Sequence, residues 1–415
     1  MTAPTRTREV LHDRNFRRLF LGSSVSLVGS RVTLIALPLT ALTLLDATAF
    51  QVGLLSALGT AAFLVIGLPA GAWIDRVPKR PVLIGADLAR AAVVATIPLA
   101  WWLHLLTIQQ LYAVALAHGV LTVFFDVAYQ SFLPHVVGRD RLVHGNARLQ
   151  MVESGTSIAA PGIGGGLIQL MTAPAAVALD AVSFLFSALA VRAIPGTVEA
   201  ATTRTERRRL HKDILDGLRF VFADHRLRAI AACTSTFNLF YGAQSAMLIV
   251  LMAGDLRFPA AVIGLVSTIA AAGGLLGATT VGTLTQRLGA GRTIWLSAGL
   301  AGLTAFVVAA ISGGWIFWVA CAGQFASAAG MTIYNVTQVS LRQIICPDDL
   351  LGRMNATMRF LVWGTLPLGG LLGGTTATAI GARPTLIVAA TGMSLAFLWV
   401  FLSPLRSYAP PTGSA

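Results

Sequence analysis

"GAWIDRVPKRP", residues 71–81, is a short charged segment between two long apolar runs. It carries four charged side chains, in a chain of which only 11% of residues are charged. A degraded copy, "GTLTQRLGAGR", occurs at residues 282–292. The pair of segments indicates that long apolar stretches are joined by short charged loops, and that the chain contains a repeat.

The apolar runs predict helices that cross a membrane. Of the 415 residues 55% are hydrophobic, and the mean hydropathy is +0.75. Runs of about 20 apolar residues match the ~30 Å hydrocarbon core of a bilayer. Each run is continuously apolar instead of alternating, which favours helices over strands. We predict an all-α polytopic membrane protein with spans over residues 19–45, 51–74, 81–103, 108–133, 149–172, 173–195, 229–252, 261–285, 293–311, 314–341, 357–380 and 384–404.

The net charge of +13 is distributed unevenly. Nearly all of the 30 Lys and Arg residues fall in loops on one side of the predicted spans, and the loops on the other side hold only Arg257 and Arg383. This is the positive-inside pattern, which predicts that both termini are cytoplasmic. A nucleic-acid binder would instead gather basic and aromatic residues on one folded face, so we expect no nucleic-acid partner. The three cysteines lack metal-ligand spacing, and we expect neither a metal nor a cofactor.

The chain contains an internal sequence repeat. Residues 71–81 match 282–292, and "RLVHGNARLQ" (141–150) matches "LLGRMNATMR" (350–359), both at a separation of about 210 residues. We therefore predict two pseudo-symmetric six-helix bundles in the same orientation, residues 1–195 and 229–415. The linker, 196–228, is basic and then amphipathic at "DILDGLRFVFADHRLRA" (213–229). It is either a short helix at the inner membrane surface or a solvated connector.

These segments resemble the major facilitator superfamily over the full length of the chain. Residues 71–80 are similar to its loop signature G-x-x-x-D-R-x-G-R-R, and "RLQMVESGTSIAAPGIGGGLIQ" (148–169) is similar to the bacterial branch that contains enterobactin exporters and macrolide-efflux proteins. The resemblance implies a secondary transporter in which the charged loop latches the two halves on the cytoplasmic side. The alternative is that the loop cations are ordinary topology anchors. The gate residues that the resemblance assigns are Gly71, Asp75, Arg76 and Arg80, with Gly282 and Arg287 in the second copy.

A second signature lies in the fifth span. "TSIAAPGIGG" (156–165) resembles the antiporter pattern G-x-x-x-G-P-x-x-G-G, and keeps Pro161, Gly164 and Gly165. Small residues at this spacing let two helices approach closely. In the superfamily the pattern goes with exporters, so the resemblance implies export.

Ionisable side chains inside the spans are candidates for function, because they are costly in a bilayer. Asp87 and Arg90 are three residues apart and are expected to form a structural ion pair. The candidates for proton coupling are Asp126, Asp180 and Glu153. Arg31 lies near the middle of the first span, where either substrate contact or a buried counter-charge would explain it.

Polar stripes predict which helices face a wet cavity. Span one presents Ser23, Ser26, Ser30 and Thr33 at helical spacing. The candidates for the substrate cavity are Arg31, Asn238, Tyr241, Gln324, Tyr334 and Asn335. The alternative for any such stripe is packing between helices, since small polar residues also hold membrane helices together.

The sequence contains no G-x-x-x-x-G-K-[ST] nucleotide loop, so we expect transport to run on an ion gradient. We predict a proton-coupled exporter of amphiphilic small molecules, drugs or secondary metabolites, and not an enzyme. Its expected partners are the substrate, protons and the lipid bilayer. We expect a monomer in the bacterial cytoplasmic membrane. The alternatives are a dedicated siderophore or lipid exporter, an importer, or a sensor that has lost transport.

Overall fold

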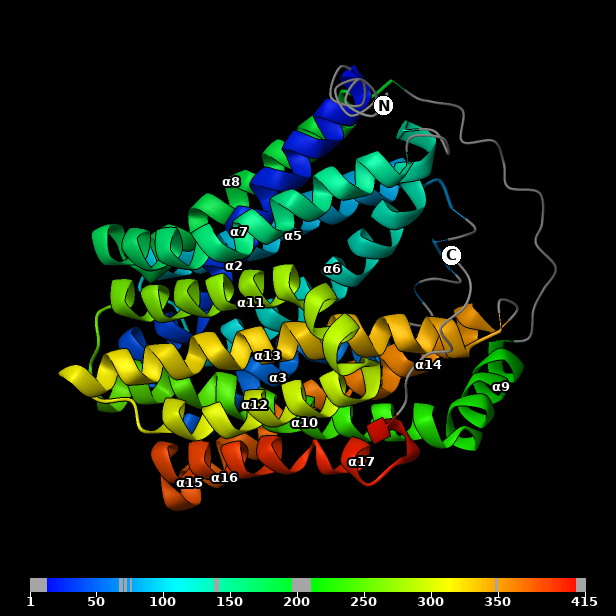
Figure 1. Cartoon of the computed structure of the whole chain (residues 1–415). Helices are drawn as coiled ribbons and strands as arrows, with labels where there is room; N and C mark the ends of the chain where they lie inside the picture. The colour runs from blue at the N-terminus through cyan, green and yellow to red at the C-terminus, as the bar shows by residue number, and fades with distance from the viewer. Residues whose placement is uncertain are drawn as a thin grey trace. The chain divides into compact units, whose positions relative to one another are not determined.

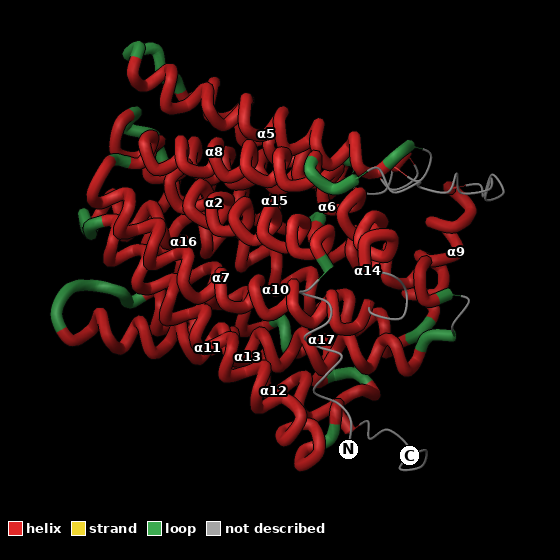
Figure 2. The backbone as a smooth tube through the Cα atoms, turned by 90° about the horizontal axis from the view of Figure 1, so that it is seen from above, coloured by secondary structure: helices red, strands yellow, loops and turns green. Residues whose placement is uncertain are grey.

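The computed structural model describes residues 13–66, 70, 73–74, 77–137, 142–195, 210–347 and 350–407. Within these ranges every regular element is a helix (Figure 2). Nine of the helices in the described ranges are long and apolar enough to cross a membrane. The α-helices are α2 (Arg14–Leu44), α3 (Ala49–Val65), α5 (Lys79–Trp102), α6 (Ile108–Val137), α7 (Leu142–Met171), α8 (Ala173–Arg192), α9 (Leu210–Ala223), α10 (His225–Ile249), α11 (Ala260–Leu288), α12 (Ala290–Ala309), α13 (Trp315–Ile345), α14 (Leu351–Trp363), α15 (Thr365–Ile380), α16 (Ala382–Leu395) and α17 (Leu398–Phe401).

The predicted spans coincide with these helices, with differences of detail. Nine spans match the long apolar helices, and the others match α3, α7 and the pair α14–α15. The eleventh span is one run in the sequence but is divided at Gly364. The seventh continues beyond α10 as a π-helical turn over Val250–Asp255. The fifth and sixth spans are joined by Thr172 alone, whose positive φ of 109° reverses the chain.

The chain divides into two compact units. Unit 1 comprises Met1–Ala47, Leu58–Thr205 and Pro259–Leu265, and unit 2 comprises Thr48–Ala57, Glu206–Phe258 and Val266–Ala415. The units therefore follow the sequence halves except at two places. The first residues of α3 group with unit 2, and the first residues of α11 group with unit 1.

In unit 1, α8 packs between α2 and α5, and α5 also contacts α6. Glycines on α2 allow a close crossing with α8: a methyl group at Gly22 would lie 3.0 Å from the Ala190 Cβ, and one at Gly29 would collide with the side-chain oxygens of Asp180 and Ser183. Close backbone approach of this kind is typical of helix pairs in membranes. It brings a polar stretch of α8 directly against α2.

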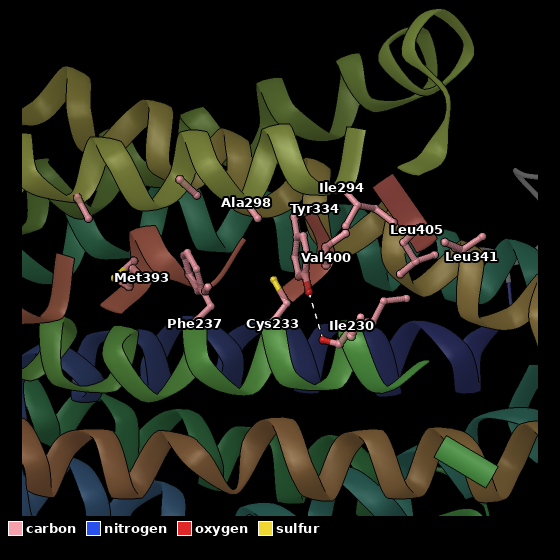
Figure 3. Packing of buried hydrophobic residues seen from close by; sticks show 14 of the residues in the cluster. Ile230, Cys233, Phe237, Ile294, Ala298, Tyr334, Leu341, Met393, Val400 and Leu405 are labelled. Carbon is pink, nitrogen blue, oxygen red and sulfur yellow. Dashed lines mark hydrogen bonds between the residues drawn. The ribbon is translucent and has the colours of Figure 1, made fainter. Parts of the chain in front are cut away.

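In unit 2, α10 packs against α15 and α16, and α12 packs against α13 and α16. A methyl group at Gly242 would lie 2.5 Å from the Leu366 carbonyl oxygen, so glycine sets the spacing of α10 and α15. The core between α10, α12, α13 and α16 is apolar and includes Phe237, Tyr334 and Met393 (Figure 3). This core fixes one wall of α10 and leaves its other side for the site described below.

The linker forms a helix where the amphipathic pattern predicted one. α9 packs against α14 within unit 2 (Figure 1). Its Val221 joins a cluster with Leu227, Met354 and Met358. Asp224 then caps α10, accepting hydrogen bonds from the backbone N–H groups of Arg226 (2.7 Å) and Leu227 (3.3 Å). The position of α9 at the membrane surface stays a prediction.

Candidate functional site

Unit 1 contains a group of charges on α5, α6 and α8, which we call the Arg90 cluster. Asp87, Arg90 and Asp180 are buried, and Asp126 is half-buried. Arg90 is 3% exposed and donates a hydrogen bond to Asp87, which is fully buried. Its guanidinium carbon lies 4.1 Å from the ring centre of Phe125 and 4.4 Å from that of Phe184. Aromatic faces attract a cation, so the two rings stabilise Arg90 where water is excluded.

The other acids of the cluster lie on neighbouring helices. Asp180 is fully buried on α8 and accepts hydrogen bonds from the Thr33 hydroxyl on α2 (2.6 Å) and the Ser183 hydroxyl (3.1 Å). Arg90 interacts electrostatically with Asp180 and also with Asp126 on α6. The Arg90 guanidinium therefore interacts with three carboxyl groups, of which that of Asp87 is hydrogen-bonded to it.

The structure thus brings together two of the three predicted coupling residues, Asp126 and Asp180. The expected pair of Asp87 and Arg90 is present, and it forms part of the same cluster. Glu153 lies elsewhere, exposed on α7. The sequence did not predict the cluster as a whole, because its members come from three helices whose packing no local pattern specifies.

The stripe on span one is a correction to the sequence interpretation. Thr33 and Ser26 are each 5% exposed, and Thr33 bonds to Asp180 instead of facing a wet cavity. The close crossing at Gly29 explains the change, because it presses this face of α2 against α8. Arg31, on the same helix, is half-buried.

Unit 2 contains a cavity of about 610 Å³ between α10, α13, α14 and the start of α15. Three of the predicted cavity residues line it: Asn238, Tyr241 and Asn335. Asn238 also donates a hydrogen bond to the Val362 carbonyl (3.0 Å), which ties α10 to the end of α14. Gln338, which continues the polar stripe of span ten, also lines the cavity. The sequence prediction missed the contributions of the end of α13 and of α14, namely Arg342, Asn355, Arg359 and Trp363.

Tyr334 and Gln324 do not belong to the residues that line this cavity. Tyr334 points from α13 into the core, where it is 1% exposed (Figure 3). Its hydroxyl lies 2.6 Å from the Thr234 hydroxyl oxygen and 3.5 Å from the Ile230 carbonyl oxygen. Gln324 is half-buried on α13. Tyr334 thus serves packing, the alternative that the stripe left open.

Of the predicted gate residues in the first copy, Gly71, Asp75 and Arg76 lie outside the described residues. Arg80 is described, and it donates a hydrogen bond to the Arg192 carbonyl (2.7 Å) at the end of α8. Arg18 donates to the next carbonyl, that of Ala193. Cations at a helix C-terminus bind its unpaired carbonyls and oppose its dipole, so these arginines hold the end of α8.

The second copy of the loop is partly exposed. Arg287 is exposed near the end of α11, and a methyl group at Gly282 would meet no neighbouring atom within 4 Å. Gly282 is therefore not a site of close helix packing. The antiporter-like segment differs: a methyl group at Gly165 would lie 2.5 Å from the Ala260 carbonyl oxygen, and the Pro161 carbonyl oxygen is in tight contact with Gly264. α7 and the first turns of α11 cross backbone to backbone there.

Residues 19–365, most of the chain, match the family model of the Major Facilitator Superfamily. The chain belongs to the major facilitator superfamily. It is therefore a multi-pass membrane transporter and not an enzyme. Solved structures share its fold: a bacterial homologue of the iron transporter ferroportin in the inward-facing state has a TM-score of 0.76 at 16% identity, covering 95% of this chain and 99% of that one. The nucleoside transporter NupG has a TM-score of 0.76 at 13% identity, covering 95% and 99%.

Curated relatives within the superfamily include efflux proteins. The multidrug efflux pump Tap of Mycolicibacterium fortuitum is 28% identical over 387 residues, which cover 91% of this chain and 93% of that protein. The enterobactin exporter EntS of Escherichia coli is 24% identical over 393 residues, which cover 93% and 90%. The superfamily membership agrees with the resemblance that the loop and span-five segments indicated.

Proposed function

We propose that this superfamily member exports amphiphilic small molecules, drugs or secondary metabolites, in exchange for protons. It would work by alternating access between two six-helix bundles, residues 1–195 and 229–415. The observation that carries the proposal is Asp180, a fully buried acid within a predicted span that accepts hydrogen bonds from the Thr33 and Ser183 hydroxyls. An ionised carboxyl group is costly inside a bilayer.

The surroundings of Asp180 give it a reason to hold a proton. Asp87 accepts a hydrogen bond from Arg90, while Asp180 takes its hydrogen bonds from hydroxyl groups. An ionised Asp180 would be a negative charge that is fully removed from solvent. A proton on its carboxyl group removes this cost. Exposure of the cluster to water on either side would let that proton exchange, which is what an antiporter requires.

Two features support export as the direction. The curated relatives Tap and EntS are named as a multidrug efflux pump and an enterobactin exporter, and both align with about nine-tenths of the chain. The antiporter-like segment of α7 makes the close helix crossing that its glycines predicted. The basic loops support cytoplasmic termini in the bacterial cytoplasmic membrane. We expect the transporter to act as a monomer.

A dedicated siderophore exporter is the second candidate. The similarity to the enterobactin exporter favours it. The two candidates differ in breadth, because a dedicated exporter would carry one chemical class while a multidrug exporter would carry unrelated amphiphiles. A susceptibility panel on a pump-deficient bacterial host that carries this chain separates them.

The proton claim is tested in proteoliposomes of purified full-length protein with fluorescein and rhodamine 123 as probes. An imposed gradient, acid inside, should drive uptake of at least one dye beyond that of empty liposomes, and a protonophore should abolish the difference. Asp126→Asn and Asp180→Asn should each lose most of the driven uptake. The control is Asp46→Asn, which neutralises an exposed carboxylate in the loop between α2 and α3. Full driven uptake by both Asn variants would refute the coupling assignment.

A further inference from the structure

The cavity of unit 2 is lined by charge of one sign. Among the described residues that line it, Arg342 and Arg359 are charged and none is acidic. The remaining polar lining is mostly amide side chains, which carry no charge. A concave site lined by one sign of charge concentrates ligands of the opposite sign.

Two polar atoms of the lining have no hydrogen-bond partner among the residues that the structure describes. Gln338 is 4% exposed, and its Oε1 is unpaired. The Nε of Arg342 is unpaired as well. The two residues are four positions apart on α13, so they lie on the same face of that helix. Buried polar groups are normally hydrogen-bonded, so an unpaired donor and an unpaired acceptor on the same helix face mark a place for a polar ligand group.

Aromatic side chains supply the apolar part of the lining. Phe237 and Tyr241 stack with their ring centres 6.4 Å apart on α10. On α14 the guanidinium carbon of Arg359 lies 5.7 Å from the ring centre of Trp363. Flat rings of this kind accept planar apolar groups. The cavity, at about 610 Å³, falls in the usual size range of small-molecule sites.

We propose that this cavity binds anionic amphiphiles, molecules that carry a carboxylate, sulfonate or phosphate group on an aromatic or other apolar body. The inference rests on the proposed export function and narrows its substrate class. Arg342 would donate to the anionic oxygens, for which a guanidinium is well suited. Gln338 would accept from a hydroxyl or N–H of the ligand, and the aromatic residues would hold its body.

The test compares two dyes that share a xanthene core, anionic fluorescein and cationic rhodamine 123. Binding to the full-length protein in phosphatidylcholine nanodiscs is measured by fluorescence anisotropy at pH 7.4, without any gradient. Fluorescein should bind about tenfold or more tightly than rhodamine 123. Arg342→Gln should weaken fluorescein binding about ten- to hundredfold, the range for one charge-assisted hydrogen bond. Arg292→Gln removes the same charge from an exposed position on α12, and should leave binding unchanged.

A second variant keeps the test decisive if Arg342→Gln does not fold. Gln338→Glu places a carboxylate beside Arg342 with little change in shape, so it should weaken fluorescein and strengthen rhodamine 123. Tighter binding of rhodamine 123 by the unmodified protein would overturn the proposal, as would fluorescein binding that neither substitution changes. Failure of the export function is a separate result: fluorescein would bind with the expected dependence on Arg342, but no proton gradient would drive its transport.

Discussion

The Arg90 cluster of unit 1 and the cavity of unit 2 use the same residue type in opposite ways. Arg90 is enclosed by Asp87 and two phenylalanine rings and is almost fully buried. Arg342 is half-buried and lines a cavity. Among the described residues the Nε of each arginine is unpaired, so the contrast lies in their surroundings. The Arg90 guanidinium is paired with Asp87 inside the helix bundle, whereas that of Arg342 borders space that a ligand can occupy. The difference suggests that the proton and the substrate are handled by different halves of the chain.

Each region also depends on a different kind of packing. The cluster needs the close crossing of α2 and α8 at Gly29, which brings Thr33 to Asp180. The cavity needs a gap beside α10, which the hydrogen bond from Asn238 to the Val362 carbonyl helps to keep in shape. Substitutions that loosen the crossing of α2 and α8 should therefore lower the stability of the fold. Substitutions that line the cavity of unit 2 should instead change ligand affinity.

The largest effect is expected for Arg90→Gln. It leaves the buried carboxyl groups without their cation, and breaking a buried ion pair costs about 3–5 kcal/mol. The midpoint of thermal unfolding, followed by tryptophan fluorescence of the purified protein, should fall strongly. Arg287→Gln, at an exposed position, is the control and should change it little. The double variant Asp87→Asn/Arg90→Gln should recover part of the loss, since the two residues interact directly. An unchanged unfolding midpoint for Arg90→Gln would show that the ion pair of Asp87 and Arg90 does not stabilise the fold.

Gly29→Ala should have the next largest effect. The added methyl group would meet the side-chain oxygens of Asp180 and Ser183, and overpacking of this kind costs about 1–3 kcal/mol. The matched control is Gly166→Ala on α7, where a methyl group would meet no neighbouring atom within 4 Å. The same unfolding measurement applies to both. Equal midpoints for the two variants would mean that α2 and α8 are free to separate slightly at this crossing.

Sequence reasoning reached the helices and the family more easily than the sites. Long apolar runs predict membrane helices directly, because the bilayer fixes their length. The charge pair Asp87–Arg90 was found because it is local in sequence. The role of Thr33 was missed, since a serine- and threonine-rich stripe reads the same whether it faces water or another helix. The charged residues of the cavity, Arg342 and Arg359, were counted among the basic residues of the positive-inside pattern, and a role in binding was therefore not expected for them.

The smallest effect on stability is expected for Asp224, the residue that caps α10 and lies outside the membrane-spanning helices. The Arg226 guanidinium, together with two backbone N–H groups, holds the pKa of Asp224 below its usual range, against the opposing effect of burial. A carboxyl group whose pKa is lower in the folded state stabilises the protein at pH values above its unfolded pKa, near 3.9, and loses this contribution as the pH falls through the folded pKa. Asp224→Asn should therefore destabilise the protein by less than about 1 kcal/mol at neutral pH.

The pH dependence is the diagnostic part of that prediction. Asparagine caps helices about as well as aspartate, so the variant loses the charge interaction and keeps the cap. The difference in unfolding midpoint between the two proteins should be constant from pH 7 to 5 and shrink below about pH 4. Glu153→Gln, which removes an exposed carboxylate, provides the baseline. A difference that grows with acid would reverse the sign expected for a lowered pKa.

The division of proton and substrate between the two halves is tested most directly by dye exchange in proteoliposomes of the Asp180→Asn variant. The dye is whichever of fluorescein and rhodamine 123 the unmodified protein transports faster. Exchange of labelled for unlabelled dye at equal pH requires substrate binding but no net proton movement. The account predicts that Asp180→Asn keeps this exchange and loses uptake driven by a pH gradient. Loss of exchange and driven uptake together would contradict it, because the buried acid would then be needed for the substrate itself.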